Sequence, residues 1–364
     1  MQIAEAINLL QQMAPPAYQE SYDNAGLIVG QVNTALKGVL VSLDCTEAVL
    51  EEALEKGCNL IVAHHPIVFK GLKRLTGATY VERVLLKAIK NDIAIYAIHT
   101  NLDNMWNGVN AEIAQRIGLQ QSRILAPKSQ LLRKLVVFVP TEACSQVAEA
   151  LYAAGAGNIS NYSKCSFRSP GTGSFQPNAA ANPFIGPAEQ YEEVEEMLLE
   201  VIFEAILQRS ILKALFESHP YEEVAHDIIS LENEHPRVGS GMIGLLPEAM
   251  PTLDFLQMLK EKMPIACIRH TAIHSEKVQK IALCGGAGFF LLGQAIAQKA
   301  DVFITADVKY HEFFDADNQL VLADIGHYES EFFTKHLIAK FLSEKITNIA
   351  INLSSTNTNP IHYL

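Results

Sequence analysis

The sequence lacks an excess of positive charge. Its 364 residues include 28 lysines and arginines against 40 aspartates and glutamates, which gives a formal net charge of −12. A general nucleic-acid binder needs a basic face, so this balance argues against nucleic acid as a partner. This charge balance does not exclude a basic or metal-binding pocket within a protein whose surface is acidic.

Long uninterrupted hydrophobic runs are also missing. The most apolar stretch, residues 281–297, is broken by several glycines and by Gln294, whereas a membrane span needs about 20 mostly apolar residues. The first 20 residues contain no lysine or arginine, unlike a signal peptide. None of the six cysteines forms a C-x-x-C pair, which favours buried, reduced thiols. We therefore expect a cytoplasmic protein without membrane association.

The chain does have enough hydrophobic residues to form a large core. They make up 49% of the sequence, and charged residues make up 19%. This composition excludes bulk disorder. At roughly 100–200 residues per domain, the length predicts two or three domains.

Short apolar runs alternate with helical stretches near the N-terminus. Strands are expected over residues 38–43, 59–63 and 93–98, with helices over 46–56 and 81–91 between them. This β-α-β-α-β order predicts an α/β fold with a largely parallel sheet covered by helices.

A similar alternation returns near the C-terminus, with strands expected over 280–284, 301–305 and 319–324. With an offset of 242, residues 38–65 align without gaps on residues 280–307. One interpretation is a duplication that produces two similar β-α-β half-sheets. The alternative is that any two β-α-β units share such an apolar pattern.

The middle of the chain follows a different order, β-α-β-β-α-β, which is typical of a ferredoxin-like α+β domain. Its clearest elements are a strand over 135–140, helices over 145–154 and 205–218, and a strand over 223–231. Polar, turn-prone segments border this region. We predict that residues 129–236 form a domain inserted between residues 1–128 and 237–364, the two halves of one discontinuous domain.

Two adjacent histidines, His64 and His65, stand where the expected strand 59–63 ends. Neighbouring side chains of a strand point to opposite faces, so the pair suits two metal ions better than one. Pro66 ends the strand pairing, and both side chains can then reach a cleft beyond the strand, where open α/β sheets bind ligands. For an isolated pair, the alternative is one core histidine and one surface histidine.

Two further strand ends add imidazole and carboxylate groups. His99 and Asp103 follow one strand, in a loop whose Asn and Asp residues are also ordinary in turns. His327 and Glu331 follow another strand and stand four positions apart, so they share one helix face. Acidic residues are common in a first helical turn, and each pair alone is a weak signal.

Together, these strand ends predict a metal site made of three histidines and two carboxylates. The predicted ligands are His64, His65, Asp103, His327 and Glu331. This set suits Zn²⁺, Fe²⁺ or Mn²⁺. It can serve two ions if a carboxylate bridges them and water fills open positions, as in catalytic sites. His99 and His311, which also follow strands, are the candidate catalytic proton carriers.

Four dispersed motifs carry a resemblance to a known family. They are AHHPIVF (63–69), IHTNLDN (98–104), ITADVKYHEF (304–313) and GHYESE (326–331). In these motifs the chain resembles the Nif-three-like family, whose members are named GTP cyclohydrolase I type 2 homologues or dinuclear metal-centre hexameric proteins. The middle region, including SHPYEEVAHDI (218–228), resembles the PII/CutA-like insert of the longer bacterial members.

The resemblance implies a dinuclear centre on the same five ligands. It implies two divalent ions per subunit, zinc first, with iron or manganese as alternatives. It also implies a toroidal homohexamer whose metal centres face an internal cavity. Two departures from the family pattern are Tyr22, where a tryptophan is usual, and Ala306, where a glycine is usual. Neither is a proposed ligand.

Two classes of function follow. The first is a metal-dependent hydrolase or cyclohydrolase that acts on a nucleotide-like small molecule through a metal-activated water, with His99 or His311 moving protons. The second is a non-catalytic metal-binding hexamer, regulatory or scaffolding, in which the insert senses a ligand or gates the cavity. DNA binding is disfavoured by the net charge of −12.

Overall fold

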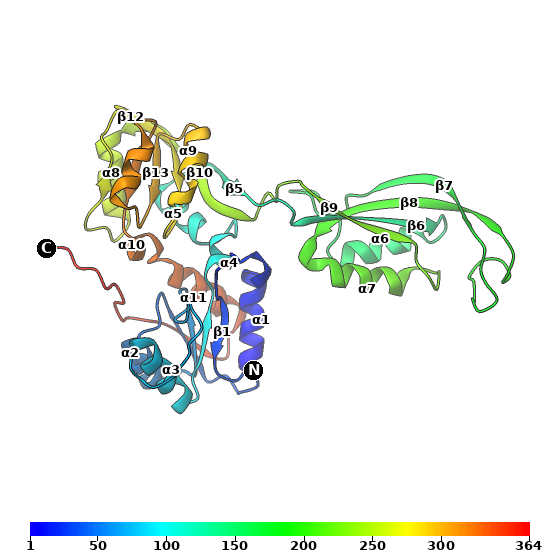
Figure 1. Cartoon of the computed structure of the whole chain (residues 1–364), viewed down its shortest axis with the longest axis horizontal. Helices are drawn as coiled ribbons and strands as arrows, with labels where there is room; N and C mark the ends of the chain where they lie inside the picture. Colours follow the sequence, from blue (N-terminus) through cyan, green and yellow to red (C-terminus); the bar gives the residue numbers. More distant parts are fainter. The chain divides into compact units, whose positions relative to one another are not determined.

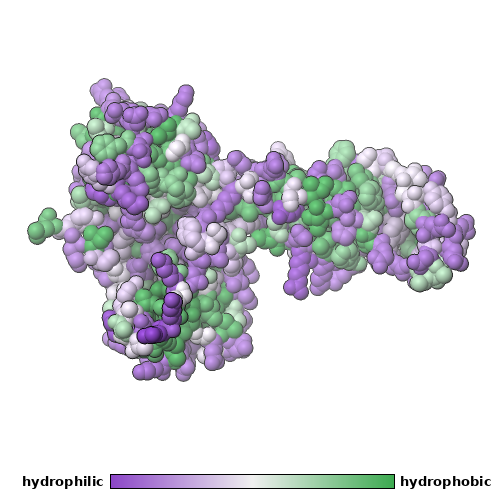
Figure 2. Space-filling view, viewed as in Figure 1, coloured by the Kyte–Doolittle hydropathy of each residue, from purple (hydrophilic) through white to green (hydrophobic).

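The structure is a computed structural model that describes residues 1–364. The chain divides into two compact units: residues 1–126 together with 237–364, and residues 127–236 (Figure 1). Both units are mixed α/β, and they are described here one at a time. No helix is long and apolar enough to cross a membrane. Hydrophilic residues intermingle with hydrophobic ones over the face of both units that Figure 2 shows.

The discontinuous unit contains a five-stranded sheet in the order β1-β4-β3-β2-β15. The strands are β1 (Gly26–Val29), β2 (Gly38–Ser42), β3 (Leu60–Ala63), β4 (Ala94–Ala97) and β15 (Ala350–Leu353). All neighbours are parallel except β1, which runs antiparallel to β4. Every residue of β2, β3 and β4 is buried, as expected for continuous apolar strands covered on both faces.

A second, six-stranded sheet has the order β11-β14-β13-β12-β10-β5. Its strands are β5 (Gln120–Pro127), β10 (Gly239–Pro251), β11 (Arg269–His270), β12 (Lys277–Leu283), β13 (Val302–Thr305) and β14 (Val321–Asp324). Val39 pairs with Leu60 in the first sheet, and Ile281 pairs with Val302 in the second. The offset of 242 seen in the sequence therefore relates residues that pair in the same way.

Helices cover both sheets. They are α1 (Ile3–Met13), α2 (Glu47–Glu55), α3 (Tyr80–Lys90), α4 (Thr100–Asp103), α5 (Val109–Ile117), α8 (Thr252–Lys262), α9 (Leu292–Ala297), α10 (His327–Glu331) and α11 (Thr334–Lys345), with 3-10 turns η1 (Pro16–Tyr18), η3 (Phe289–Leu291) and η4 (Tyr310–Ala316). One core joins the two sheets through α1, α5, α8 and α11. Alternate strand residues face away from it: Val41 belongs to this core, whereas Leu40 packs against α2 and α3.

Local sequence signals fix several helix ends. The side chain of Thr46 accepts a hydrogen bond from the Val49 amide at the start of α2, and Thr79 does the same for Glu82 in α3. Such N-caps satisfy amides that have no partner within the helix. Gly118 ends α5 in the left-handed region at φ +80°, a conformation that favours glycine.

The inserted unit, residues 127–236, has the element order β-α-β-β-α-β. Its elements are β6 (Leu132–Pro140), α6 (Cys144–Ala153), β7 (Phe167–Phe175), β8 (Glu192–Glu204), η2 (Ala205–Leu207), α7 (Gln208–Ser218) and β9 (His226–Leu231). They form an antiparallel sheet in the order β7-β8-β6-β9. Leu135 and Val137 pack with α6 and α7 in its core. Strand β7 lies where the sequence shows little periodicity, because an edge strand that is mostly exposed needs no alternation.

The chain leaves and re-enters the discontinuous unit through neighbouring strands. Strands β5 and β10 are adjacent in the six-stranded sheet. Just beyond them, the His235 amide donates a hydrogen bond to the Lys128 carbonyl at 2.7 Å. The two connections to the inserted unit are therefore paired with each other.

Candidate metal centre

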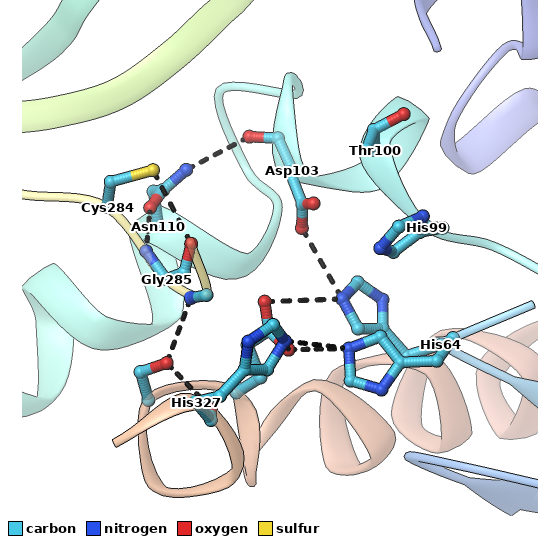
Figure 3. Close-up of polar contacts among 12 residues, drawn as sticks. His64, His99, Thr100, Asp103, Asn110, Cys284, Gly285 and His327 are labelled. Carbon is cyan, nitrogen blue, oxygen red and sulfur yellow. Dashed lines mark hydrogen bonds and ion pairs between the residues drawn. The ribbon is translucent and has the colours of Figure 1, made fainter. Parts of the chain in front are cut away.

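Strand ends from both sheets bring the candidate ligands together. His64 and His65 directly follow β3, and their amides donate to the carbonyls of Ser42 and Leu43 at the end of β2. Asp103 ends α4, which follows β4. Helix α10, which follows β14 of the other sheet, carries the remaining two candidates. Figure 3 shows His64, Asp103 and His327 gathered around one point from these separate elements.

The first ligand group consists of His65, His327 and Glu331. Glu331 Oε2 lies 2.8 Å from His65 Nε2 and 3.1 Å from His327 Nε2, and the two ring nitrogens are 3.2 Å apart. Each ring is oriented through its other nitrogen: Asp44 Oδ1 lies 2.8 Å from His65 Nδ1, and Asp307 Oδ2 lies 2.6 Å from His327 Nδ1. Carboxylate–histidine pairs of this kind orient imidazole ligands in metal sites.

The second group consists of His64, Asp103 and Glu331. His64 Nε2 lies 3.6 Å from Asp103 Oδ1 and 3.8 Å from Glu331 Oε1. His64 Nδ1 lies 2.8 Å from the backbone carbonyl oxygen of Ile98. This contact orients the ring so that Nε2 points into the site. Both His64 Nε2 and Asp103 Oδ1 are buried without a hydrogen-bond partner. Buried polar atoms without a partner cost free energy. These two atoms converge, so a cation between them would satisfy both.

Glu331 belongs to both groups and offers one oxygen to each. Its residue is only 2% exposed. A carboxylate in this position can bridge two ions, so three imidazoles and two carboxylates suffice for both. The residues present therefore fit divalent metal.

Burial and the mutual charges of the clustered side chains shift their pKa values. Burial and the negative charge of Glu331 raise the pKa of Asp103 to about 7. Burial disfavours charged histidine, but Glu331 and the paired aspartates overcome it and raise the pKa of His65 to about 9 and of His327 to about 11. Burial also opposes ionisation of Glu331, yet the two imidazolium charges hold its pKa well below the usual range.

His99 lies beside the cluster. Its ring centroid is 5.3 Å from that of His64 and 5.5 Å from that of His65, and the ring nitrogens of the three lie within 4.8 Å of one another. Asp23 Oδ1 holds His99 Nδ1 at 2.8 Å. Burial opposes the charge on Asp23, but hydrogen bonds from His99 and Thr100 lower its pKa to about 2.

His311, the other candidate proton carrier, is not brought to this cluster. It lies on η4, exposed, and its ring contacts Tyr310 and Phe314 instead. The turn after β13 places His311 outside the cluster. Asp307, in the same motif, lies at the site and contacts His327 Nδ1.

Sequence reasoning missed Asp44 and Asp23, the two carboxylates that orient His65 and His99. Asp44 shows the signal used for the ligands, since it follows β2 at the strand end next to His64. Asp23 lies in an irregular segment, so no periodic pattern marks it.

A glycine turn after β12 packs directly on the site. Gly286 has φ +63°, and a Cβ built on it would lie 2.3 Å from Glu331 Oε1. Its amide donates to Ser330 Oγ at 2.9 Å. The turn therefore allows close approach of the backbone to Glu331, and a side chain there would displace the carboxylate.

The cluster opens into a cavity of about 420 Å³. Its walls include the aromatic side chains of Tyr22 and Phe69 and, from the C-terminal segment, residues 359–361. Such a volume is suitable for a small molecule, since ligand pockets span about 300–1,000 Å³.

The chain is similar to a known family and to named proteins over nearly its whole length. Residues 1–360 match the family described as Duf34/NIF3 (NGG1p interacting factor 3). A Bacillus subtilis protein named GTP cyclohydrolase 1 type 2 homolog is 38% identical over 99% of this chain and 98% of its own length. A relative with the same name from Halalkalibacterium halodurans is 39% identical and covers 98% of each chain.

Two solved structures share the fold of the whole chain. A Bacillus cereus protein described as related to NIF3 superposes with a TM-score of 0.90 at 39% identity, covering 100% of this chain and 99% of its own. The Staphylococcus aureus protein SA1388 superposes with a TM-score of 0.80 at 30% identity, with the same coverage.

Proposed function

Because the chain belongs to the Duf34/NIF3 family, we propose that it is a dinuclear metal protein that hydrolyses a nucleotide-like small molecule. The observation that carries this proposal is the position of Glu331, which offers one oxygen to each of two ligand groups. The name of the relatives, GTP cyclohydrolase 1 type 2 homolog, favours a nucleotide-like substrate.

The proposed site holds two divalent ions, with zinc as the first choice. His65, His327 and Glu331 would hold one, and His64, Asp103 and Glu331 the other. When bound, such ions supply Lewis-acid polarisation and lower the pKa of water. Three protein ligands per ion leave positions open, as in catalytic centres.

The chain's own residues supply the remaining chemistry. Asp23 fixes His99 through Nδ1, which leaves His99 Nε2 to accept and return a proton beside the cluster. Tyr22 and Phe69 line the cavity and offer apolar surface to a flat ring. Asn359 and Ile361 form part of the wall of the same cavity.

A second candidate function is regulatory. A compact inserted unit, residues 127–236, carries its own cavity of about 540 Å³. This supports a non-catalytic metal-binding assembly in which a ferredoxin-like insert of the PII/CutA type senses a ligand. From the resemblance of its motifs, we also propose that the chain is cytoplasmic and forms a toroidal homohexamer, and sedimentation of the full chain tests the assembly.

Metal content per subunit tests the dinuclear proposal. The protein would be purified without a chelator or affinity tag and measured by elemental mass spectrometry beside His65→Ala, Glu331→Ala and a control, His274→Ala, whose side chain is exposed and outside the site. We expect near two ions in the parent and the control, and loss of both ions in Glu331→Ala.

Substrate turnover then separates the two functions. Metal-loaded parent protein is incubated with GTP and related nucleotides, and products are followed by liquid chromatography. Conversion that disappears in Glu331→Ala supports the hydrolase. Two bound ions without conversion of any nucleotide would favour the regulatory candidate, and a folded parent that takes up no added metal would overturn both.

A further inference from the structure

The inserted unit contains a cavity of about 540 Å³ that the proposed function does not use. It lies between the end of β7, the following segment 176–185 and the turn 221–225. Its lining includes four aromatic rings and three carboxylates but no lysine, arginine or histidine. The cavity is therefore aromatic and negatively charged.

The aromatic rings stand at angles to one another. The ring of Tyr221 lies 6.0 Å from that of Phe175 at an interplanar angle of 63°, and 6.2 Å from that of Phe184 at 51°. Behind it, the His219 ring packs on Tyr221 at 5.1 Å. Rings inclined in this way do not stack on one another, and the face of each ring carries the negative part of its quadrupole, which attracts cations.

A buried carboxylate forms part of the same cavity. Glu196, on β8, is 7% exposed, and its Oε1 accepts a hydrogen bond from the Tyr221 hydroxyl at 2.9 Å. Oε2 has neither a hydrogen bond nor an ion pair and lies against Gly173, where a Cβ would approach within 2.1 Å. A buried carboxylate normally has a cationic partner, and Glu196 has none within the protein.

A second carboxylate, that of Glu222, forms a hydrogen bond with the segment 176–185 that borders the cavity. Glu222 Oε1 accepts a hydrogen bond from the Asn182 amide at 2.9 Å. This contact holds Phe184 near Tyr221, although Phe184 itself is 62% exposed. Glu223 adds a third negative charge to the lining.

A bare metal ion fits this cavity poorly. His219 Nε2 lies 3.0 Å from the Phe138 carbonyl oxygen, and its Nδ1 accepts from the Tyr221 amide at 3.1 Å, so neither nitrogen is available as a ligand. The groups of side chains that converge closely enough to hold an ion all lie in the other unit. Aromatic faces with a nearby carboxylate are instead the recognition chemistry of organic ammonium ions.

We propose that this cavity binds a small organic ammonium compound, whose cationic head lies against Tyr221 and Phe184 and is balanced by Glu196. The volume is that of a pocket for a whole small molecule rather than for a single ion. The proposal stands independently of the metal centre, because none of these residues belongs to it.

Calorimetric titration of the full-length, metal-loaded protein tests the proposal. Choline chloride is compared with 3,3-dimethylbutan-1-ol, a neutral compound of the same shape, at constant ionic strength. Choline should bind about tenfold more tightly, which corresponds to about 1.4 kcal/mol, because only the cation is attracted to the ring faces and to Glu196. Equal binding of the two compounds, or no heat beyond that of potassium chloride, would overturn the proposal.

Variants locate the binding. Glu196→Gln removes the charge but keeps an acceptor for Tyr221, and Phe184→Ala removes one exposed ring; each should weaken choline binding about tenfold. Phe167→Ala is the matched control, because Phe167 is 64% exposed on β7 and outside the cavity. Unchanged thermal unfolding verifies the fold of each variant. Parent-like affinity in Glu196→Gln, or the same loss in Phe167→Ala, would contradict the assignment.

Discussion

Thr358 and Asp44 are 314 positions apart, and the Thr358 hydroxyl donates a hydrogen bond to Asp44 Oδ2 at 2.5 Å. The other oxygen of this carboxylate holds His65 Nδ1. The C-terminal segment is thus linked through one carboxylate to a candidate metal ligand. It also lines the cavity at residues 359–361.

Thr358→Val is therefore expected to weaken metal binding without removing a ligand. Loss of the hydroxyl leaves Asp44 less constrained. Changing a direct partner of a ligand typically costs about 10–100-fold in affinity, and Thr358 acts one contact further away, so we expect a loss at or below about tenfold. Competition for zinc with a chromogenic chelator measures the effect. Thr141→Val, at an exposed threonine of the inserted unit, is the control. Parent-like zinc affinity in Thr358→Val would show that Asp44 needs no support from the C-terminal segment.

Glu52→Gln should loosen the same segment at its other end. Glu52 accepts hydrogen bonds from the hydroxyls of Ser354, Ser355 and Thr356. Burial opposes its charge, but Lys56 and these donors hold the pKa of Glu52 well below the ordinary 4.5. We expect a loss of about 1–3 kcal/mol in the free energy of unfolding at pH 7.

The pH dependence of this variant has a definite sign. Because the folded-state pKa of Glu52 is depressed, its stabilisation is present above about pH 4.5 and is lost as the pH falls below that value. Urea unfolding of parent and variant at pH 7 and in the acid range should show a difference that shrinks on acidification. A difference that stays constant with pH would contradict the ionic role of Glu52.

Metal affinity should rise with pH between about 6 and 9. Without metal, the pKa of Asp103 is raised to about 7 and that of His65 to about 9, so both hold protons near neutrality. A cation must displace these protons, and each one displaced makes affinity increase with pH. Calorimetry in two buffers of different ionisation enthalpy counts the protons released. Binding without proton release would contradict the proposed ligands.

Gly286→Ala should disturb the metal centre more than the fold. Its left-handed φ of +63° costs a side chain about 1–2 kcal/mol, and the added Cβ would collide with Glu331 Oε1. We expect reduced metal content with only a modest fall in melting temperature. Gly293→Ala is the matched control, since it lies in α9 with open space around its Cα and alanine favours helix. Full metal content in Gly286→Ala would refute this role of the turn.

The sequence predicted the candidate ligands because their signals are local. His64 and His65 follow a buried apolar run, and the spacing of His327 and Glu331 puts both on one helical face. Since parallel strands end at the same sheet edge, strand order groups His64, His65 and Asp103. Bringing them to His327 and Glu331, which follow a strand of the other sheet, depends on how the two sheets pack. His311 met the same criterion, yet η4 directs it elsewhere, because local pattern does not define the path of an irregular turn.

The residues that orient the ligands could not be predicted in this way. Asp23 and His99 are 76 positions apart, and Thr358 reaches Asp44 across most of the chain. Such pairs form only when the strands of the five-stranded sheet and the C-terminal segment are in place. The sequence pattern around one partner carries no information about the other, so the tertiary structure was needed to identify these pairs.

The paired connections at Lys128 and His235 have a consequence for how this architecture can vary. Neighbouring strands lie about 5 Å apart, so β5 and β10 could be joined by a tight hairpin turn if the intervening residues were removed. Any guest domain whose own termini lie equally close could be spliced in at the same place. The junction between β5 and β10 can therefore accept an inserted domain, and the residues that converge on Glu331 all lie outside the inserted residues 127–236.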